Sequence, residues 1–290
     1  MLNEVQDFAA LLYDRFGHDF RDYRPATLAN RLQNLCARLR LSGIPALHDW
    51  LIRHPDRIAL VVDHICIPVT ELFREPDTLV QVREHVFPML RSFPQVTVWH
   101  AGCAGGHEAF SMAILLHEAG ILPRTRIFAS DISSGILEKA ATGRVEPQQI
   151  DGANARYVSS GGSARLADYF RPLDGGMKLD DDLLNKITFV QHNLATDAVF
   201  CEANLIFCCN VLIYFERQLQ ARALELFSDS LVRGGFLCLG QRETPIGAQK
   251  KFARLPGTGW IYRPLSQPHP QISRSQSAST ANLLNDGKLK

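Results

Sequence analysis

Apolar side chains recur at helical spacing over the first 65 or so residues. In residues 4–16 they fall on one side of a helix, and in residues 25–43 leucines form a stripe at successive spacings of four, three and four. Pro25 suits the first turn of this second helix, and Gly43 suits its end. Two shorter helical stretches follow, so the pattern predicts a small all-helical domain over residues 1–66.

The pattern then changes to short apolar runs with β-branched or aromatic residues. These runs are TVWHAG (97–102), RIFASD (126–131), ITFVQHN (187–193), NLIFCCN (204–210) and FLCLGQ (236–241). Helical segments at 107–119, 133–142 and 216–232 separate several of them. Alternating strands and helices favour a mainly parallel sheet covered on both faces. With right-handed crossovers, the predicted fold over residues 67–264 is a doubly wound α/β domain.

Two segments stand apart from this alternation. Residues 145–190 are richer in Gly and Asp and too irregular for one crossover helix, so we expect a small inserted β subdomain there. Residues 265–290 are rich in Ser, Gln and Asn, which predicts a disordered tail.

Composition and charge give no global attraction to nucleic acid or membrane, because the formal net charge is only +1. The seven cysteines are scattered and form no CxxC pair, so no metal site is predicted and reduced thiols are expected. The N-terminus lacks the basic start and apolar core of a signal peptide, and no run approaches the roughly 18 apolar residues that span a bilayer. We therefore expect a cytoplasmic protein without membrane insertion.

Candidate chemistry begins in the loop after the first strand, at Gly102, Gly105 and Gly106. Their GxxGG spacing differs from the GxGxxG of dinucleotide binders, and a tight turn without a ligand explains it equally well. Asp131 ends the next strand, where an acid either holds ribose hydroxyls or merely caps the helix after Ser133. Loop and acid together favour a nucleoside-containing ligand.

Five stretches together resemble a known family. They are VTELFRE (69–75), AGCAGGHEAFSMAI (101–114), FASDIS (128–133), QHNL (191–194) and IFCCNVLIYF (206–215). In order and spacing they resemble the CheR family of chemoreceptor glutamate methyltransferases over roughly residues 5–264. The resemblance implies a Rossmann-like class I methyltransferase domain, S-adenosylmethionine as cofactor and S-adenosylhomocysteine as product.

The resemblance also implies which residues bind the cofactor. Thr70 and Arg74 are expected over its methionine end, Glu108 at its amino group and Asp131 at its ribose. Each has a structural alternative: Arg74 could form a surface ion pair, and Glu108 could be a first-turn carboxylate favoured by the helix dipole.

The later motifs complete the expected site. Asn193 is expected near the adenine with Leu194 beside it, and Asn210 and Val211 on the catalytic side. Tyr214 is expected at the mouth where the acceptor enters. The alternatives are asparagines that terminate strands in turns and a tyrosine that belongs to the core.

Some positions depart from the family pattern. Pro68 stands where the family often has Asn, Leu72 replaces the first Phe, His107 replaces an acid and Cys209 replaces an Arg. Residues 240–243, Gly-Gln-Arg-Glu, replace Gly-His-Ser-Glu. These departures leave cofactor binding in place and concern mainly the specificity for the acceptor.

The implied reaction transfers a methyl group to a glutamate side chain. That carboxylate is ionised at neutral pH and needs no general base, which agrees with the lack of a Ser/His/Asp or Cys/His arrangement. We expect Arg74 and Tyr214 to act as the catalytic residues by positioning the acceptor carboxylate. The alternatives are a catalytically silent relative that regulates a signalling partner and a nicotinamide-dependent oxidoreductase, which the GxxGG spacing disfavours.

The expected partner is the acidic helical bundle of a chemoreceptor. Five arginines crowd the second helical segment, against one nearby acid, Asp22; they are Arg21, Arg24, Arg31, Arg38 and Arg40. Arg31 and Arg38 are seven residues apart and share a helix face. A solvated face is the plain alternative, and no nucleic-acid recognition motif accompanies the arginines.

Overall fold

The computed structural model describes residues 2–66, 70–247 and 251–265. Pro68 and the tail from residue 266 onward, which carried predictions, lie outside the described residues. None of the helices in this described part combines the length and apolar character needed to cross a membrane.

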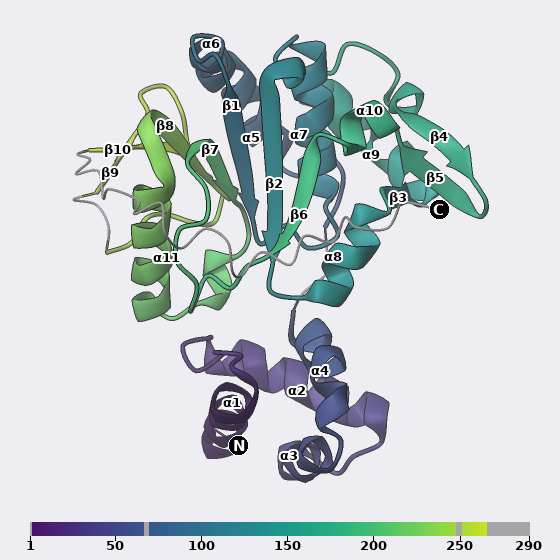
Figure 1. Ribbon diagram of the computed structural model, residues 1–290, viewed down its shortest axis with the longest axis vertical. Coiled ribbons are helices and arrows are strands. Elements are labelled where there is room, and N and C mark those ends of the chain that lie inside the picture. Colours follow the sequence, from purple (N-terminus) through teal and green to yellow (C-terminus); the bar gives the residue numbers. More distant parts are fainter. Residues whose placement is uncertain (1, 67–69, 248–250, 266–290) are drawn as a thin grey trace, which may run out of the picture.

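Four α-helices form the N-terminal domain (Figure 1). They are α1 (Leu2–Phe16), α2 (Pro25–Leu39), α3 (Ile44–Arg53) and α4 (Ile58–Ile65), with the 3-10 turn η1 (Pro55–Arg57) before α4. The predicted leucine stripe of α2 is the buried side of this helix: Leu28, Leu32 and Leu35 pack into one core with Phe8 and Leu12 of α1. This domain has its own apolar core.

A seven-stranded sheet forms the second domain, in the order β6-β2-β1-β7-β8-β10-β9. The strands are β1 (Val96–Ala101), β2 (Thr125–Asp131), β6 (Ile187–Gln191), β7 (Ala203–Cys208), β8 (Leu231–Leu239), β9 (Phe252–Arg254) and β10 (Ile261–Pro264). The first five strands in this order are parallel, whereas β10 runs antiparallel to β8 and β9. The prediction of a doubly wound, Rossmann-like fold is confirmed. The antiparallel edge formed by β10 and β9 is a feature that the sequence analysis did not predict.

Successive residues of the central strands face two different cores. Val98 and Phe207 point into the larger core, whereas Trp99 and Cys208 point into the other. Helices cover both faces, which is why these strands are apolar throughout and do not alternate with polar residues. The helices of this domain are α5 (Pro76–Gln81), α6 (Phe87–Leu90), α7 (His107–Glu118), α8 (Ser134–Ala141), α9 (Pro147–Ser159), α10 (Asp181–Leu184) and α11 (Arg217–Ser230). The shorter turns are the π-helical η2 (Val82–Val86) and the 3-10 turns η3 (Leu122–Arg124), η4 (Leu166–Tyr169) and η5 (Leu212–Tyr214).

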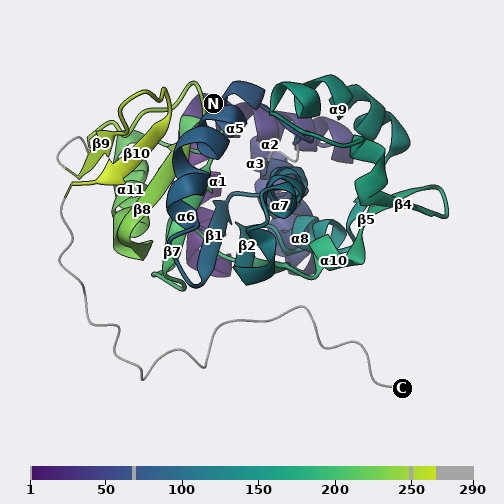
Figure 2. The same ribbon diagram turned by 90° about the horizontal axis from the view of Figure 1, so that it is seen from above.

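The predicted insertion is a small three-stranded sheet with α9 beside it, at the opposite end of the molecule from β9 and β10 (Figure 2). Its strands are β3 (Arg144–Val145), β4 (Phe170–Leu173) and β5 (Gly176–Leu179), in the order β3-β5-β4. The buried carboxylate of Glu118, at the end of α7, accepts hydrogen bonds from the hydroxyls of Tyr157 and Tyr169 and from the N–H of Ser163. Glu118 therefore anchors the insertion to the α/β core.

The helical domain lies at the edge of the sheet where the central parallel strands end (Figure 1). Two backbone hydrogen bonds fix it there, from Arg24 N–H to Tyr214 O and from Glu216 N–H to Asp22 O, both 2.8 Å long. Between them, the rings of Tyr23 and Phe215 pack with centroids 5.0 Å apart. The start of α2 is thus tied directly to the segment that follows β7.

Candidate cofactor and acceptor site

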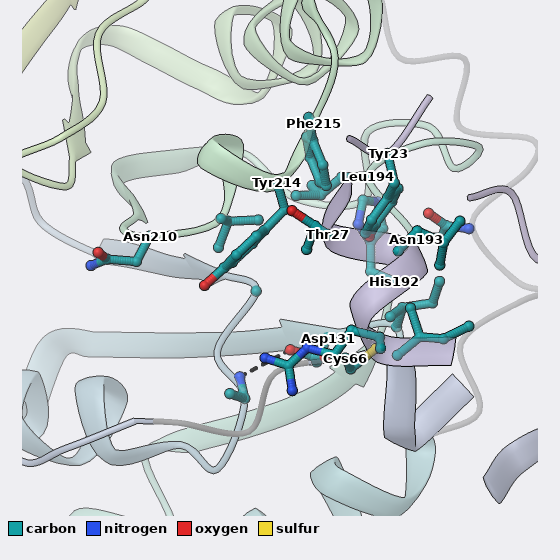
Figure 3. A pocket seen from close by; sticks show the side chains of 17 residues that line it. Tyr23, Thr27, Cys66, Asp131, His192, Asn193, Leu194, Asn210, Tyr214 and Phe215 are labelled. Atoms are coloured by element: carbon teal, nitrogen blue, oxygen red, sulfur yellow. Dashed lines mark hydrogen bonds between the residues drawn. The ribbon is translucent and has the colours of Figure 1, made fainter. Parts of the chain in front are cut away.

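A cavity of about 750 Å³, part of it open to solvent, lies between the helical domain and the carboxyl ends of β1, β2, β6 and β7 (Figure 3). Open α/β sheets bind ligands at this edge. The lining residues are Tyr23, Thr27, Leu28, Arg31, Ile65, Cys66, Gly102, Ala104, Asp131, Ile132, His192, Asn193, Leu194, Asn210, Val211, Tyr214 and Phe215. Six of the nine residues that the family resemblance placed at the cofactor or the acceptor are among them.

Asp131 occupies the tip of β2, as predicted. Its carboxylate accepts a 2.9 Å hydrogen bond from the N–H of Ala104 in the glycine loop and a 3.2 Å bond from the N–H of Ser133. Burial raises the pKa of Asp131 above its ordinary value, although these N–H groups favour the ionised form. Asp131 therefore both shapes the loop and lines the cavity.

Asn193 and Leu194 line the cavity beyond β6, where the chain turns. The side-chain oxygen of Asn193 accepts a 2.9 Å hydrogen bond from the N–H of Ala195, and its own N–H donates to Asp197. Asn193 is therefore a turn residue and a lining residue at once, and its side-chain NH₂ group is the part left for a ligand. Leu194 adds an apolar surface beside it.

Asn210, just after β7, is held by charged residues from a distant segment. Its side-chain oxygen accepts a 3.3 Å hydrogen bond from Arg74, and its NH₂ group donates a 2.9 Å bond to Glu75. The second carboxylate oxygen of Glu75 accepts from the N–H of Gln241 at 3.1 Å. Glu75 thus connects three loops at the sheet edge, a role that its sequence position did not reveal.

A second carboxylate, Glu243, holds the backbone of the same loop. One of its oxygens accepts from the N–H groups of Asn210 and Gly240, both at 2.8 Å, and the other from Val211 at 2.9 Å and Ile213 at 3.3 Å. Burial raises the pKa of Glu243, and the four N–H groups counteract that effect. Glu243 is the last residue of the segment that corresponds to Gly-His-Ser-Glu in the family. This match is the sequence feature from which its role could have been predicted.

The other three predicted residues, Thr70, Arg74 and Glu108, are not among the described residues that line the cavity. Thr70 and Glu108 lie around the glycine loop beside it, and Arg74 contacts Asn210 of the lining. The Thr70 methyl is so close to Gly105 that a side chain there would approach it to 3.1 Å. Glu108, in the first turn of α7, lies 2.7 Å from Nδ1 of the buried His100.

Strained backbone concentrates at this edge of the sheet. Four of the five non-glycine residues with positive φ in the described part of the chain surround the site: Phe73, Glu75, Ala104 and Asn210. Gly102 also has positive φ, and a Cβ there would approach a Val211 methyl to 2.5 Å. Such clustering of costly conformations is characteristic of functional sites.

The departure at Cys209 does not place a new group in the cavity. Its side chain packs against the larger core, where a hydrogen bond with Cys238 and burial hold the pKa of the thiol well above its usual range. The thiol is therefore neutral and belongs to the larger core instead of the lining of the cavity.

The predicted arginine patch divides into parts with different surroundings. Arg21 forms an ion pair with Asp19 at 2.9 Å and lies over the Tyr13 ring. The acid that neutralises Arg21 is therefore Asp19 and not Asp22. Arg31 lines the cavity, whereas the three other arginines are exposed; these are Arg24, Arg38 and Arg40.

Family models account for most of the chain. Residues 3–66 match the all-alpha domain of CheR methyltransferases, and residues 68–261 match their SAM binding domain. The chain belongs to the CheR methyltransferase family. The family model identifies S-adenosylmethionine as the cofactor, which confirms the prediction.

Curated relatives cover nearly the same length. Cher3 of Pseudomonas putida, named as a methyltransferase, is 39% identical over 241 residues, which are 83% of this chain and 88% of that protein. A chemotaxis protein methyltransferase of Vibrio anguillarum is 28% identical over 259 residues, with 86% and 92% coverage. A solved SAM-dependent methyltransferase from Geobacter sulfurreducens with S-adenosylhomocysteine is 14% identical, covers 62% of this chain and 53% of its own, and has a TM-score of 0.32.

The residues of the cavity fit an adenosyl cofactor. A partly buried carboxylate, that of Asp131, stands where ribose hydroxyls need an acceptor. The amide of Asn193 and the apolar side chains of Ile132 and Leu194 form a surface suited to a purine. Glu108 supplies a negative charge beside the glycine loop for an ammonium group.

Proposed function

We propose that this protein transfers the methyl group of S-adenosylmethionine to glutamate side chains of chemoreceptors, giving methyl esters. The observation that supports this most strongly is the cavity at the sheet edge, with Asn210 fixed by Glu75 and Glu243 and with Tyr214 projecting into it (Figure 3). A fixed wall beside the donor suits a reaction whose rate depends on aligning donor and acceptor.

The residues around Asn210 can align an acceptor without proton transfer. The cofactor supplies a methyl group already activated by its sulfonium, and the acceptor is a carboxylate that is ionised at neutral pH. Arg74 is exposed next to Asn210, where its guanidinium can also bind a carboxylate oxygen. In this proposal Arg74 and Tyr214 hold the incoming glutamate in line, and alignment supplies most of the rate enhancement.

The receptor would approach along the exposed side of α2. Arg24, Arg38 and Arg40 present positive charge there, while Arg21 is paired with Asp19. Charge of this kind suits an acidic helical bundle and would accelerate its association at low salt.

Transfer of a radiolabelled methyl group tests the proposal. The purified protein is incubated with labelled cofactor and the cytoplasmic fragment of a chemoreceptor from the same organism, or with that fragment carrying glutamine at its methyl-accepting positions. We expect label only on the glutamate form, released as methanol in alkali because the product is an ester. Label that survives alkali, or equal label on both fragments, would contradict glutamate esterification.

A regulatory role without catalysis is the second candidate, and Cys209 in place of the family's arginine is the observation that favours it. A silent protein would bind S-adenosylhomocysteine yet transfer no label to any receptor fragment. The same two measurements therefore separate the candidates.

A further inference from the structure

Helix α2 contributes one of its faces to the cofactor cavity. Thr27, Leu28 and Arg31 lie on adjacent turns of α2 and line the cavity together with Tyr23, which precedes the helix. The helical domain is therefore part of the cofactor site, as well as a candidate surface for the receptor.

Arg31 is the one cationic residue among the described residues that line this cavity. It is partly buried, and it forms no hydrogen bond or ion pair with any other residue that the structure describes. A guanidinium carries five N–H donors, and at the wall of a cavity that is partly open to solvent these donors can bind either water or a ligand that enters the cavity.

The neighbours of Arg31 place it on the ribose side of the cavity. Arg31 lines the same cavity as Asp131 and as Cys66, the residue that follows α4. By contrast, Thr70 and Glu108, which are expected at the methionine end, lie around the glycine loop beside the cavity. Arg31 therefore lines the same part of the site as Asp131, the residue expected to hold the ribose.

Resting on the proposed cofactor site, we infer that Arg31 is a cofactor-binding residue that holds the adenosine half of S-adenosylmethionine from the α2 side. Its planar guanidinium can donate hydrogen bonds to ribose or purine acceptors and can stack on the purine ring. The helical domain would then bind the cofactor with one face of α2 and the acceptor with another.

The test compares two arginines of the same helix. Arg31→Ala, Arg31→Lys and Arg38→Ala are titrated calorimetrically with S-adenosylhomocysteine and with methylthioadenosine, which lacks the amino-acid half. Because charge-assisted hydrogen bonds are the strong ones, we expect Arg31→Ala to weaken binding of both ligands by about tenfold. Arg31→Lys should recover only part of this loss, since lysine lacks the planar fork. Arg38→Ala removes an equal charge outside the cavity and should leave the affinity for both ligands unchanged.

Each other outcome overturns a defined part of this inference. Wild-type affinity of Arg31→Ala for both ligands would remove Arg31 from the site. A loss seen with S-adenosylhomocysteine alone would move Arg31 to the amino-acid half, and an equal loss in Arg38→Ala would reduce the effect to general charge. Failure of the wild-type protein to bind either ligand would instead overturn the cofactor site itself. Unchanged circular dichroism and melting temperatures show that all variants are folded.

Discussion

Replacing Glu243 with glutamine tests whether this carboxylate holds the loop after β7 in place. Each of its oxygens accepts two backbone N–H groups, those of Asn210 and Gly240 on one side and those of Val211 and Ile213 on the other. In glutamine one of these oxygens becomes an NH₂ donor. Whichever way the amide turns, two N–H groups lose their acceptor and face another donor.

The magnitude follows from these two lost bonds. Hydrogen bonds to a charged group contribute about 1.5–3 kcal/mol each, so two correspond to about 3–6 kcal/mol. Removing a buried charge offsets part of this cost, and we expect a net loss of about 3 kcal/mol. For a chain of this size that loss lowers the melting temperature by roughly 6–12 °C.

Thermal unfolding followed by circular dichroism measures the first effect, and calorimetric titration with S-adenosylhomocysteine measures the second. We expect the affinity of Glu243→Gln to fall as well, because Asn210 and Val211 lose their fixed position beside the cavity. Asp229→Asn, an exposed acid on α11, is the matched control and should melt like the wild type. Wild-type melting and wild-type affinity of Glu243→Gln would refute the role given to this carboxylate.

Three further predictions concern other carboxylates. Asp131→Asn should bind S-adenosylhomocysteine more weakly at neutral pH. Because burial raises the pKa of Asp131, the affinity of the wild type should decline on acidification from a pH above 3.8. Calorimetry at several pH values should show no such decline from this group in the variant. Glu75→Ala should lower kcat for methyl transfer about tenfold or more, with a smaller change in the KM for the cofactor, because Asn210 loses its orientation. Asp77 is a nearby exposed acid, and Asp77→Ala should resemble the wild type. Glu118→Gln should lower the free energy of unfolding in urea by about 2–4 kcal/mol, because buried hydroxyl and N–H donors lose a charged acceptor.

The pH dependence of the Glu118 effect has a defined sign. Burial alone would raise the pKa of Glu118, but hydrogen bonds from Tyr157, Ser163 and Tyr169 and the charge of Arg83 lower it in the folded protein. Its stabilising contribution is therefore complete above the ordinary value of 4.5 and is lost as the pH falls through the lowered folded-state pKa. The difference between wild type and Glu118→Gln should shrink on acidification; a constant difference would contradict the assignment.

Much of the fold could be predicted because its parallel strands are buried on both faces. Runs such as NLIFCCN are apolar throughout, and the helices between them have clear periodicity. The antiparallel edge could not be read in the same way, because β9 and β10 have only three and four residues. Such short segments carry too little pattern to distinguish strand from loop.

The candidate site was predictable where single residues end strands, as Asp131 and Asn210 do. Glu75 was not, because its partner Asn210 lies 135 residues away and only tertiary packing brings the two together. Arg31 shows the same limit. A spacing of seven residues places it on the same helix face as Arg38, but the domain packs against the sheet so that Arg31 reaches the cavity and Arg38 does not.

A crystal structure of the protein with S-adenosylhomocysteine tests the central claim most directly. We expect the ribose at the carboxylate of Asp131, the purine beside Asn193 and Leu194, and helix α2 covering the adenosine. The ligand bound at another surface, or side chains filling the cavity beneath α2 while the ligand is present, would contradict this account.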